Sequence, residues 1–153
     1  MIKYRKAEIN DIDNLAIIRS IFIMEVTGCS EIEREKLETA NKIYFESALE
    51  EDSFVAWLAL DNDKIIATSG LSFSVAPPSL DRLNGKVAYI MNMFTFLEYR
   101  KQGIGMELLK RTVEEAKSRG YKKITLNATD MGKPLYEKYG FKDVKGDMVF
   151  YAE

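Results

Sequence analysis

The sequence predicts a single α/β domain in which helices pack on one mixed β-sheet. Segments with apolar residues at helical spacing alternate with short strand-like segments, in the order β-α-α-β-β-β-α-β-α-β-β. The 153 residues are enough for one domain with a real core and too few for two typical ones. Because no linker, repeat or low-complexity tract interrupts the chain, we expect residues 1–153 to form one domain.

The chain is predicted to begin with a strand and two helices. The strand covers Ile2–Ala7, and Asn10 or Asp11 caps a helix that ends at Gly28. A capping box, Ser30–Glu33, starts the second helix. The apolar residues of the first helix recur at helical spacing: Ile12, Leu15, Ala16, Phe22, Ile23 and Val26.

A hairpin and a loop lead into the second half of the chain. Strands at Ser53–Leu60 and Ile65–Val75 flank the polar turn Asp61–Lys64. Pro77 and Pro78 then open a loop that runs to Gly85.

The second half is predicted to hold a parallel crossover and a closing hairpin. The uncharged segment Val87–Leu97 is typical of a buried strand, and helical spacing continues from Ile104 to a cap at Gly120. The unit Val87–Asn127 should be a right-handed parallel crossover. The remaining elements are a strand at Lys123–Asn127, a short helix from Thr129 or Asp130 to Glu137, and a hairpin of Phe141–Val144 and Asp147–Tyr151.

Composition excludes several classes of function. Because the net charge is −2, we do not expect the chain to bind nucleic acid. No apolar run approaches the ~20 residues that span a bilayer, and the N-terminus lacks the apolar core of a signal peptide. A single cysteine, Cys29, allows no internal disulfide and fits a reducing compartment. We therefore expect a cytoplasmic protein with neither a membrane nor a nucleic acid partner.

The chain contains no histidine, which restricts its chemistry. Ser-His-Asp and Cys-His catalysis are excluded, as is any histidine-ligated metal, and we expect no metal. Acid–base work must use Tyr, Asp, Glu, Lys, the main chain or water. No residue that could act as a base neighbours Cys29 in the sequence, so we interpret Cys29 as a thiol without a catalytic role.

The most informative stretch is the glycine-bearing turn Arg100-Lys101-Gln102-Gly103-Ile104-Gly105, which lies between the buried strand and the helix. The N–H groups of a first helical turn lack internal partners and carry the positive end of the helix dipole. Gly103 and Gly105 let a ligand approach the main chain, and Arg100 and Lys101 add positive charge. The turn is therefore predicted to grip the pyrophosphate of a cofactor.

Two common phosphate motifs do not fit this turn. A P-loop requires Gly-Lys-Ser/Thr, but Met106 and Glu107 follow Gly105. A dinucleotide fingerprint requires a third small residue where Leu108 stands, and an acidic residue after the next strand.

The pattern R/Q-x-x-G-x-G/A, opening a helix after a long strand, resembles the GNAT superfamily of acetyl-CoA-dependent N-acetyltransferases. A second stretch, Gly132–Phe141, is similar to the family's LYEKxGF segment and follows at the expected distance. The resemblance is specific from about Lys86 to Phe141, and over residues 1–85 it rests on the order of elements. It implies a mostly antiparallel sheet with one parallel crossover and helices on both faces.

The resemblance also implies acetyl-CoA as the acetyl donor and a set of residues that bind it. In this family the strand before the motif splays from the next strand, and the pantetheine arm lies in the gap. Main-chain groups of that strand and of the turn, and Asn127 at the end of the next strand, are then expected to contact the donor. The residues are Met93, Phe94, Thr95, Arg100, Lys101, Gln102, Gly103, Ile104, Gly105, Met106 and Asn127.

Two catalytic residues follow from the same resemblance. A main-chain N–H near Thr95 would face the thioester oxygen and stabilise charge that develops there. Tyr136 matches the family tyrosine that protonates the departing thiolate. A phenol of pKa ~10 facing a thiol of pKa ~8.5 makes full proton transfer uphill by about 2 kcal/mol, so Tyr136 more plausibly hydrogen-bonds the sulfur.

The acceptor and the general base stay open at this point. The acceptor is expected to be a small-molecule or peptide amine, selected by residues 20–45 and the Pro77–Gly85 loop. Asn92 could orient it or merely cap a ladder edge. Candidates for the base are Glu25, Glu31, Tyr89, Glu98 or a water chain.

Two classes of function remain. The first is an N-acetyltransferase in which the amine attacks acetyl-CoA directly, and the second is a non-catalytic acyl-CoA-binding or regulatory domain of the same fold. The resemblance is compatible with a homodimer.

Overall fold

The computed structural model describes residues 1–152 and contains one mixed five-stranded sheet of order β1-β2-β3-β4-β5. The first four strands pair antiparallel, and β4 pairs parallel with β5. This arrangement confirms the predicted mixed, mostly antiparallel sheet. The strands are β1 (Lys3–Lys6), β2 (Phe54–Asp61), β3 (Lys64–Val75), β4 (Lys86–Thr95) and β5 (Lys123–Leu126).

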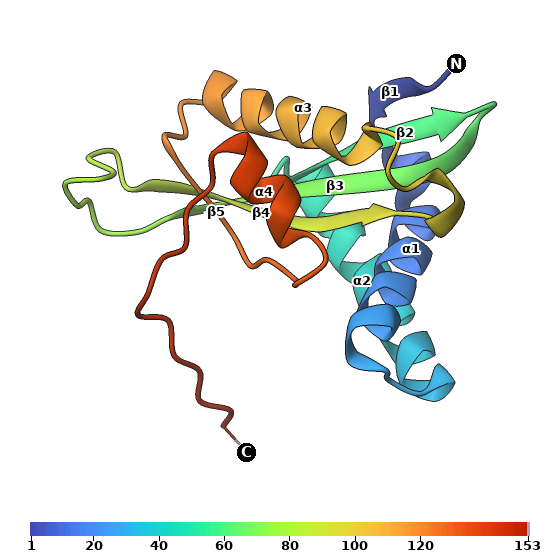
Figure 1. Ribbon diagram of the computed structural model, residues 1–153. Coiled ribbons are helices and arrows are strands. Elements are labelled where there is room, and N and C mark those ends of the chain that lie inside the picture. The colour runs from blue at the N-terminus through green and yellow to red at the C-terminus, as the bar shows by residue number, and fades with distance from the viewer. Residues whose placement is uncertain (153) are drawn as a thin grey trace.

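Helices cover both faces of the sheet, as predicted (Figure 1). Helices α1 and α2 pack on one face, where Leu15, Phe45 and Leu58 share a core cluster. Helices α3 and α4 lie on the other face, where Leu109 packs with Ile90. The helices are α1 (Ile12–Thr27), α2 (Glu31–Glu50), α3 (Ile104–Ser118) and α4 (Lys133–Tyr139), with 3-10 turns η1 (Ile9–Asp11) and η2 (Leu97–Tyr99).

Local signals place most helix ends correctly. Gly28 ends α1 in the left-handed conformation, with φ 68°. The Ser30 hydroxyl accepts from the Glu33 N–H while the Glu33 carboxylate accepts from the Ser30 N–H, which completes the capping box. Gly120 follows α3 at φ +83°, and its N–H donates to the Lys117 carbonyl.

The start of α1 differs from the prediction. Asp11 stands at the N-cap position, but its side chain makes no capping hydrogen bond to α1. Its carboxylate instead accepts from the Glu8 N–H at 2.8 Å and from the Arg5 guanidinium at 2.7 and 3.0 Å. The bidentate charged partner on β1 outcompetes the neutral helix N–H groups.

The predicted C-terminal hairpin is wrong. Residues 141–152 contain no strand, and they run away from the domain in Figure 1. An alternating pattern forms a strand only where a neighbouring strand supplies hydrogen bonds. No strand of the described chain pairs with this segment, and Val144, Met148 and Phe150 are exposed.

A β-bulge in β4 breaks the regular pairing of the sheet centre. The two steps from Thr68 to Gly70 on β3 face three steps, from Phe94 to Met91, on β4. Asn92 is in this extra stretch and adopts the left-handed conformation at φ 58°. The buried Thr68 hydroxyl donates to the Asn92 carbonyl at 2.9 Å, so β3 holds the bulge in place.

Substituting Gly70 by Ala should destabilise the fold, because there is no room for a side chain opposite the bulge. A Cβ at Gly70 would lie 2.5 Å from Phe54 Cζ, and the Phe54 ring is itself buried against Phe45. Overpacking of this kind typically costs about 1–3 kcal/mol in the free energy of unfolding. Urea denaturation measures the change, and Ser72→Ala on the same strand is the control that adds no atoms. An unchanged unfolding midpoint for Gly70→Ala would contradict the close packing.

Candidate functional site

A cleft of about 1130 Å³ opens where β4, α1, α3 and α4 meet. Its walls come from α1 between Arg19 and Val26, from β4 between Tyr89 and Thr95, and from the motif turn. The loop 127–132 and the side chains of Leu135, Tyr136 and Lys138 complete it. Segments far apart in the sequence therefore build one site.

The floor of the cleft is the free edge of β4. β4 and β5 pair only as far as Ile90 and Leu126, after which β5 ends. From Met91 to Thr95 the main chain has no strand on that side, although β3 continues to pair with the opposite edge. β4 is therefore unpaired on this edge beyond Ile90, and Met93, Phe94 and Thr95 all line the cleft.

The N-terminus of α3 faces the same cleft without a side-chain cap. Gly103 is the N-cap residue at φ 82°, and the first helical bond runs from the Glu107 N–H to the Gly103 carbonyl at 3.1 Å. The N–H groups of Ile104–Met106 consequently have no partner within the helix. A Cβ at Gly103 would meet no atom within 4 Å, and one at Gly105 would meet only Leu135 Cδ2, at 3.5 Å. Space and donors for an anion thus coincide.

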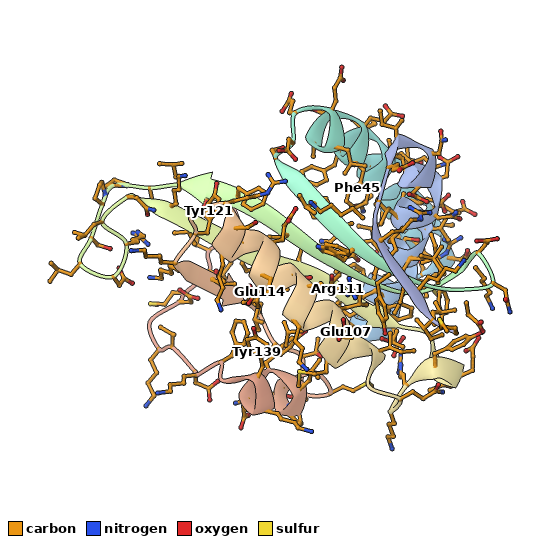
Figure 2. The ribbon with its side chains drawn as sticks, turned by 90° about the horizontal axis from the view of Figure 1, so that it is seen from above. Phe45, Glu107, Arg111, Glu114, Tyr121 and Tyr139 are labelled. Carbon is orange, nitrogen blue, oxygen red and sulfur yellow. The ribbon has the colours of Figure 1, made fainter. Side chains whose placement is uncertain are left out.

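A nearby negative charge at this helix end is already paired. Glu107, in the first turn of α3, accepts from Arg111 Nε at 2.8 Å, and the two residues lie next to each other on α3 (Figure 2). The pair reduces the repulsion that the Glu107 carboxylate would exert on an anion at the helix N-terminus.

Arg100 and Gln102 of the motif turn bind other groups of the protein and leave the anion position to the main chain. Arg100 Nε donates to the Thr95 carbonyl at 2.7 Å, and its guanidinium pairs with Glu25 at 2.9 and 3.1 Å. Gln102 Nε2 donates to the Glu98 carbonyl, which holds the turn, while Lys101 is exposed at φ 61°. Arg100 therefore links α1 to the end of β4, and the turn presents mainly its main chain.

Tyr136 stands in the cleft wall on α4. Its side chain is buried, and burial raises the pKa of the phenol to about 12. Gly132 gives the ring room, because a Cβ there would lie 3.1 Å from Tyr136 Cε2. Tyr139, in contrast, packs on Phe141 at a ring separation of 5.8 Å and lies outside the cleft lining.

The cleft contains some of the other predicted residues and lacks the rest. Asn127 lines it, as do Glu25 and Tyr89 among the candidate bases. Glu31 pairs with Arg34 on α2, and neither Glu31, Glu98 nor Cys29 lines the cleft.

The Pro77–Gly85 loop does not reach the site, contrary to the prediction for acceptor choice. It lies at the opposite end of β3 and β4 from the motif turn (Figure 1). Asn84 Nδ2 donates to the Gly120 carbonyl at 3.0 Å, and Asp81 pairs with Lys123 at 2.6 Å. Of the segment 20–45, only the α1 part lines the cleft.

Sequence reasoning missed Arg19, which lines the cleft beside Phe22 and Ile23. The signal was present, because Arg19 interrupts the apolar spacing that runs from Leu15 to Val26. The second half of this apolar face is incompletely buried because it forms the cleft wall, and Val26 is 53% exposed.

Within residues 1–152 no cluster of three or more His, Cys, Asp or Glu side chains is placed to hold a metal ion. None of the helices that the structure describes is long and apolar enough to cross a membrane.

Comparison with known proteins gives a consistent result. This chain is 35% identical in sequence to a predicted acetyltransferase from Clostridium acetobutylicum, whose crystal structure was determined with acetyl-CoA. The two structures match with a TM-score of 0.92, and the match covers 99% of this chain and 96% of that one. A GCN5-related N-acetyltransferase from Ralstonia eutropha JMP134 is 24% identical and has the same fold, with a TM-score of 0.91 over 100% of both chains. An uncharacterized N-acetyltransferase, YsnE of Bacillus subtilis (strain 168), is 28% identical over 91 residues, which span 56% of this chain and 54% of that protein.

Residues 18–141, most of the chain, match the acetyltransferase (GNAT) family. This range includes the cleft wall of α1, the splayed strand, the motif turn and Tyr136. The protein is therefore a member of the acetyltransferase (GNAT) family.

Proposed function

We propose that the protein is an N-acetyltransferase that transfers the acetyl group of acetyl-CoA directly to a primary amine, with residues 1–153 acting as one domain. One observation carries the proposal: the free edge of β4, the uncapped N-terminus of α3 and the Tyr136 phenol all face one cleft. Together they supply a phosphate site, main-chain donors for a developing oxyanion and a hydrogen-bond donor for the departing sulfur.

The main chain holds the donor in this proposal. The N–H groups of Ile104–Met106 bind the pyrophosphate, and the absent side chains at Gly103 and Gly105 let it approach. The free edge of β4 at Met93–Thr95 binds the pantetheine arm as an added strand would. Lys101 adds positive charge at the mouth, and Asn127 faces the arm from the end of β5.

The bound donor supplies an activated acetyl group: the amine nitrogen bonds to the acetyl carbon, the carbon–sulfur bond breaks, the nitrogen loses a proton and the sulfur gains one. The main chain beside Thr95 stabilises charge on the thioester oxygen. Tyr136 donates a hydrogen bond to the sulfur. With its pKa near 12, full proton transfer to a thiolate of pKa ~8.5 is uphill by about 5 kcal/mol, so the transfer completes through solvent.

The proton of the acceptor ammonium leaves through water in this mechanism. The Glu25 carboxylate faces the cleft but is already held by Arg100, and Tyr89 presents a hydroxyl rather than a carboxylate to the cleft. Water in the open cleft is the remaining route among those considered.

Gly105→Val should weaken acetyl-CoA binding while the fold survives. The backbone at Gly105 does not need a positive φ, and its Cβ position touches only Leu135, so the larger side chain fits but occupies the anion position. Loss of one or two charged hydrogen bonds raises the Kd by roughly tenfold or more. Calorimetric titration measures it, and Ser118→Val at the exposed end of α3 is the control. Equal affinities for the two variants would exclude this phosphate grip.

Tyr136→Phe should slow the chemical step and leave acetyl-CoA binding nearly unchanged, because the hydroxyl matters only when charge builds on sulfur. Single-turnover rates are expected to fall at least tenfold, within the ~10²–10⁴-fold range for acid catalysts. Because the phenol stays protonated well above pH 10, the shape of the kcat profile from pH 7 to pH 10 should not change.

Tyr139→Phe is the matched control for this variant and should be close to neutral, because Tyr139 lies outside the cleft lining. Equal single-turnover rates for the wild type and Tyr136→Phe would reduce Tyr136 to a packing residue. Acetyl-CoA binding without free thiol in the presence of any amine would favour the non-catalytic acyl-CoA-binding alternative.

A further inference from the structure

Arg19 is a cation without an acidic partner on the α1 wall of the cleft. Five of the other arginines pair with carboxylates: Arg5, Arg34, Arg100, Arg111 and Arg119. Arg19 makes no ion pair within residues 1–152, and the side chains that influence its pKa are the phenols of Tyr44 and Tyr89. Burial accordingly lowers the pKa of its guanidinium. A partly buried guanidinium facing a cleft is a site for an anion from solution.

Asn92 is a second unmatched group in the same cleft. Its side chain is 2% exposed, yet neither Nδ2 nor Oδ1 has a hydrogen-bond partner among the residues that the structure describes. Leaving a buried amide unpaired typically costs about 1–3 kcal/mol per group. The bulge holds Asn92 there at φ 58° through its carbonyl bond to Thr68. Asn92 lines the cleft, and its amide has one donor pair and one acceptor that no residue of the described chain satisfies.

These two residues line the same cleft as Thr95 and Tyr136, between which the acetyl group lies in the proposed function. On α1, Phe22 packs on Phe94 of β4 at a ring separation of 5.9 Å. Arg19 lies one helical turn before Phe22, about 5 Å along the axis, and both Arg19 and Tyr89 of β4 line the cleft. Asn92 falls between Tyr89 and Phe94 along that strand. Helix α1, which carries Arg19, covers the face of the sheet opposite α3 (Figure 1).

We propose that the acceptor is a small amine that also carries a carboxylate, with Arg19 binding the carboxylate and Asn92 hydrogen-bonding beside the reacting nitrogen. The proposal rests on the acetyltransferase function above. A carboxylate is favoured over a phosphate because Arg19 is a single positive charge with neutral neighbours, Tyr44 and Tyr89. The planar guanidinium fork also matches the two carboxylate oxygens.

Matched amines test the assignment. Phenylalanine is compared with 2-phenylethylamine, and β-alanine with ethylamine, while phosphoethanolamine against ethanolamine forms the phosphate arm. Free-CoA release gives kcat/KM for each. We expect the carboxylate member of a pair to be preferred at least tenfold by the wild type. Arg19→Gln should remove that preference, because the carboxylate then enters the cleft without a counter-charge.

Two further variants sharpen the test. Lys36→Gln removes one exposed positive charge on α2 away from the cleft, and the carboxylate-to-neutral ratio should stay at the wild-type value. Asn92→Gly keeps a residue that tolerates the positive φ and deletes the amide. It should raise KM for the carboxylate amines, while acetyl-CoA affinity measured by calorimetry changes little.

A binding readout separates this proposal from the acetyltransferase function. N-acetylphenylalanine is titrated into the protein–CoA complex of the wild type and of Arg19→Gln. Arg19-dependent binding without turnover of any amine would keep the carboxylate site and refute the transferase. Turnover with equal kcat/KM in each carboxylate pair, a preference confined to phosphoethanolamine, or no Arg19 dependence in either readout would overturn the carboxylate site.

Discussion

The structure depends on one constraint at its centre: β4 pairs with β3 along nearly its whole length but with β5 only as far as Ile90. Beyond that point one edge of β4 keeps its hydrogen-bonding groups and has no strand to satisfy them. Buried main-chain groups almost always find a partner, so such an edge is a binding surface for an extended ligand. The motif turn follows directly, and the uncapped N-terminus of α3 extends the same surface to an anion.

The bulge in the same strand places a second feature of the cleft, the side chain of Asn92. β3 accommodates the extra residue of β4 without disrupting the core packing. This is possible because Gly70 has no side chain and because the Thr68 hydroxyl donates to the Asn92 carbonyl. Asn92 is then buried with its amide unpaired. Arg19 lines the same cleft from α1, so both unmatched polar groups belong to the site where the acceptor binds in our proposal.

Electrostatic pairs set the shape of the cleft mouth. Arg100 connects the Thr95 carbonyl to Glu25, and its guanidinium also lies 5.6 Å from the centre of the Phe94 ring. Because Arg100 and Glu25 bind each other, neither side chain is free to bind a ligand in the cleft. Burial keeps the Tyr136 phenol neutral through the physiological range, which makes it a hydrogen-bond donor.

The sequence alone determined what depends on neighbours in the chain. The order of elements through α4, the end of α1 at Gly28, the Ser30 capping box and the glycine turn before α3 follow from local sterics and hydrogen bonding. Tyr136 could also be separated from Tyr139 by its position in the segment. Tertiary structure decided what depends on distant partners. Arg100 meets Glu25 across 75 positions, the Pro77–Gly85 loop turns away from the cleft, and residues 141–152 find no strand to pair with. Arg19 and Asn92 became informative only once packing showed which groups are buried without a partner, because burial and pairing are properties of the assembled fold.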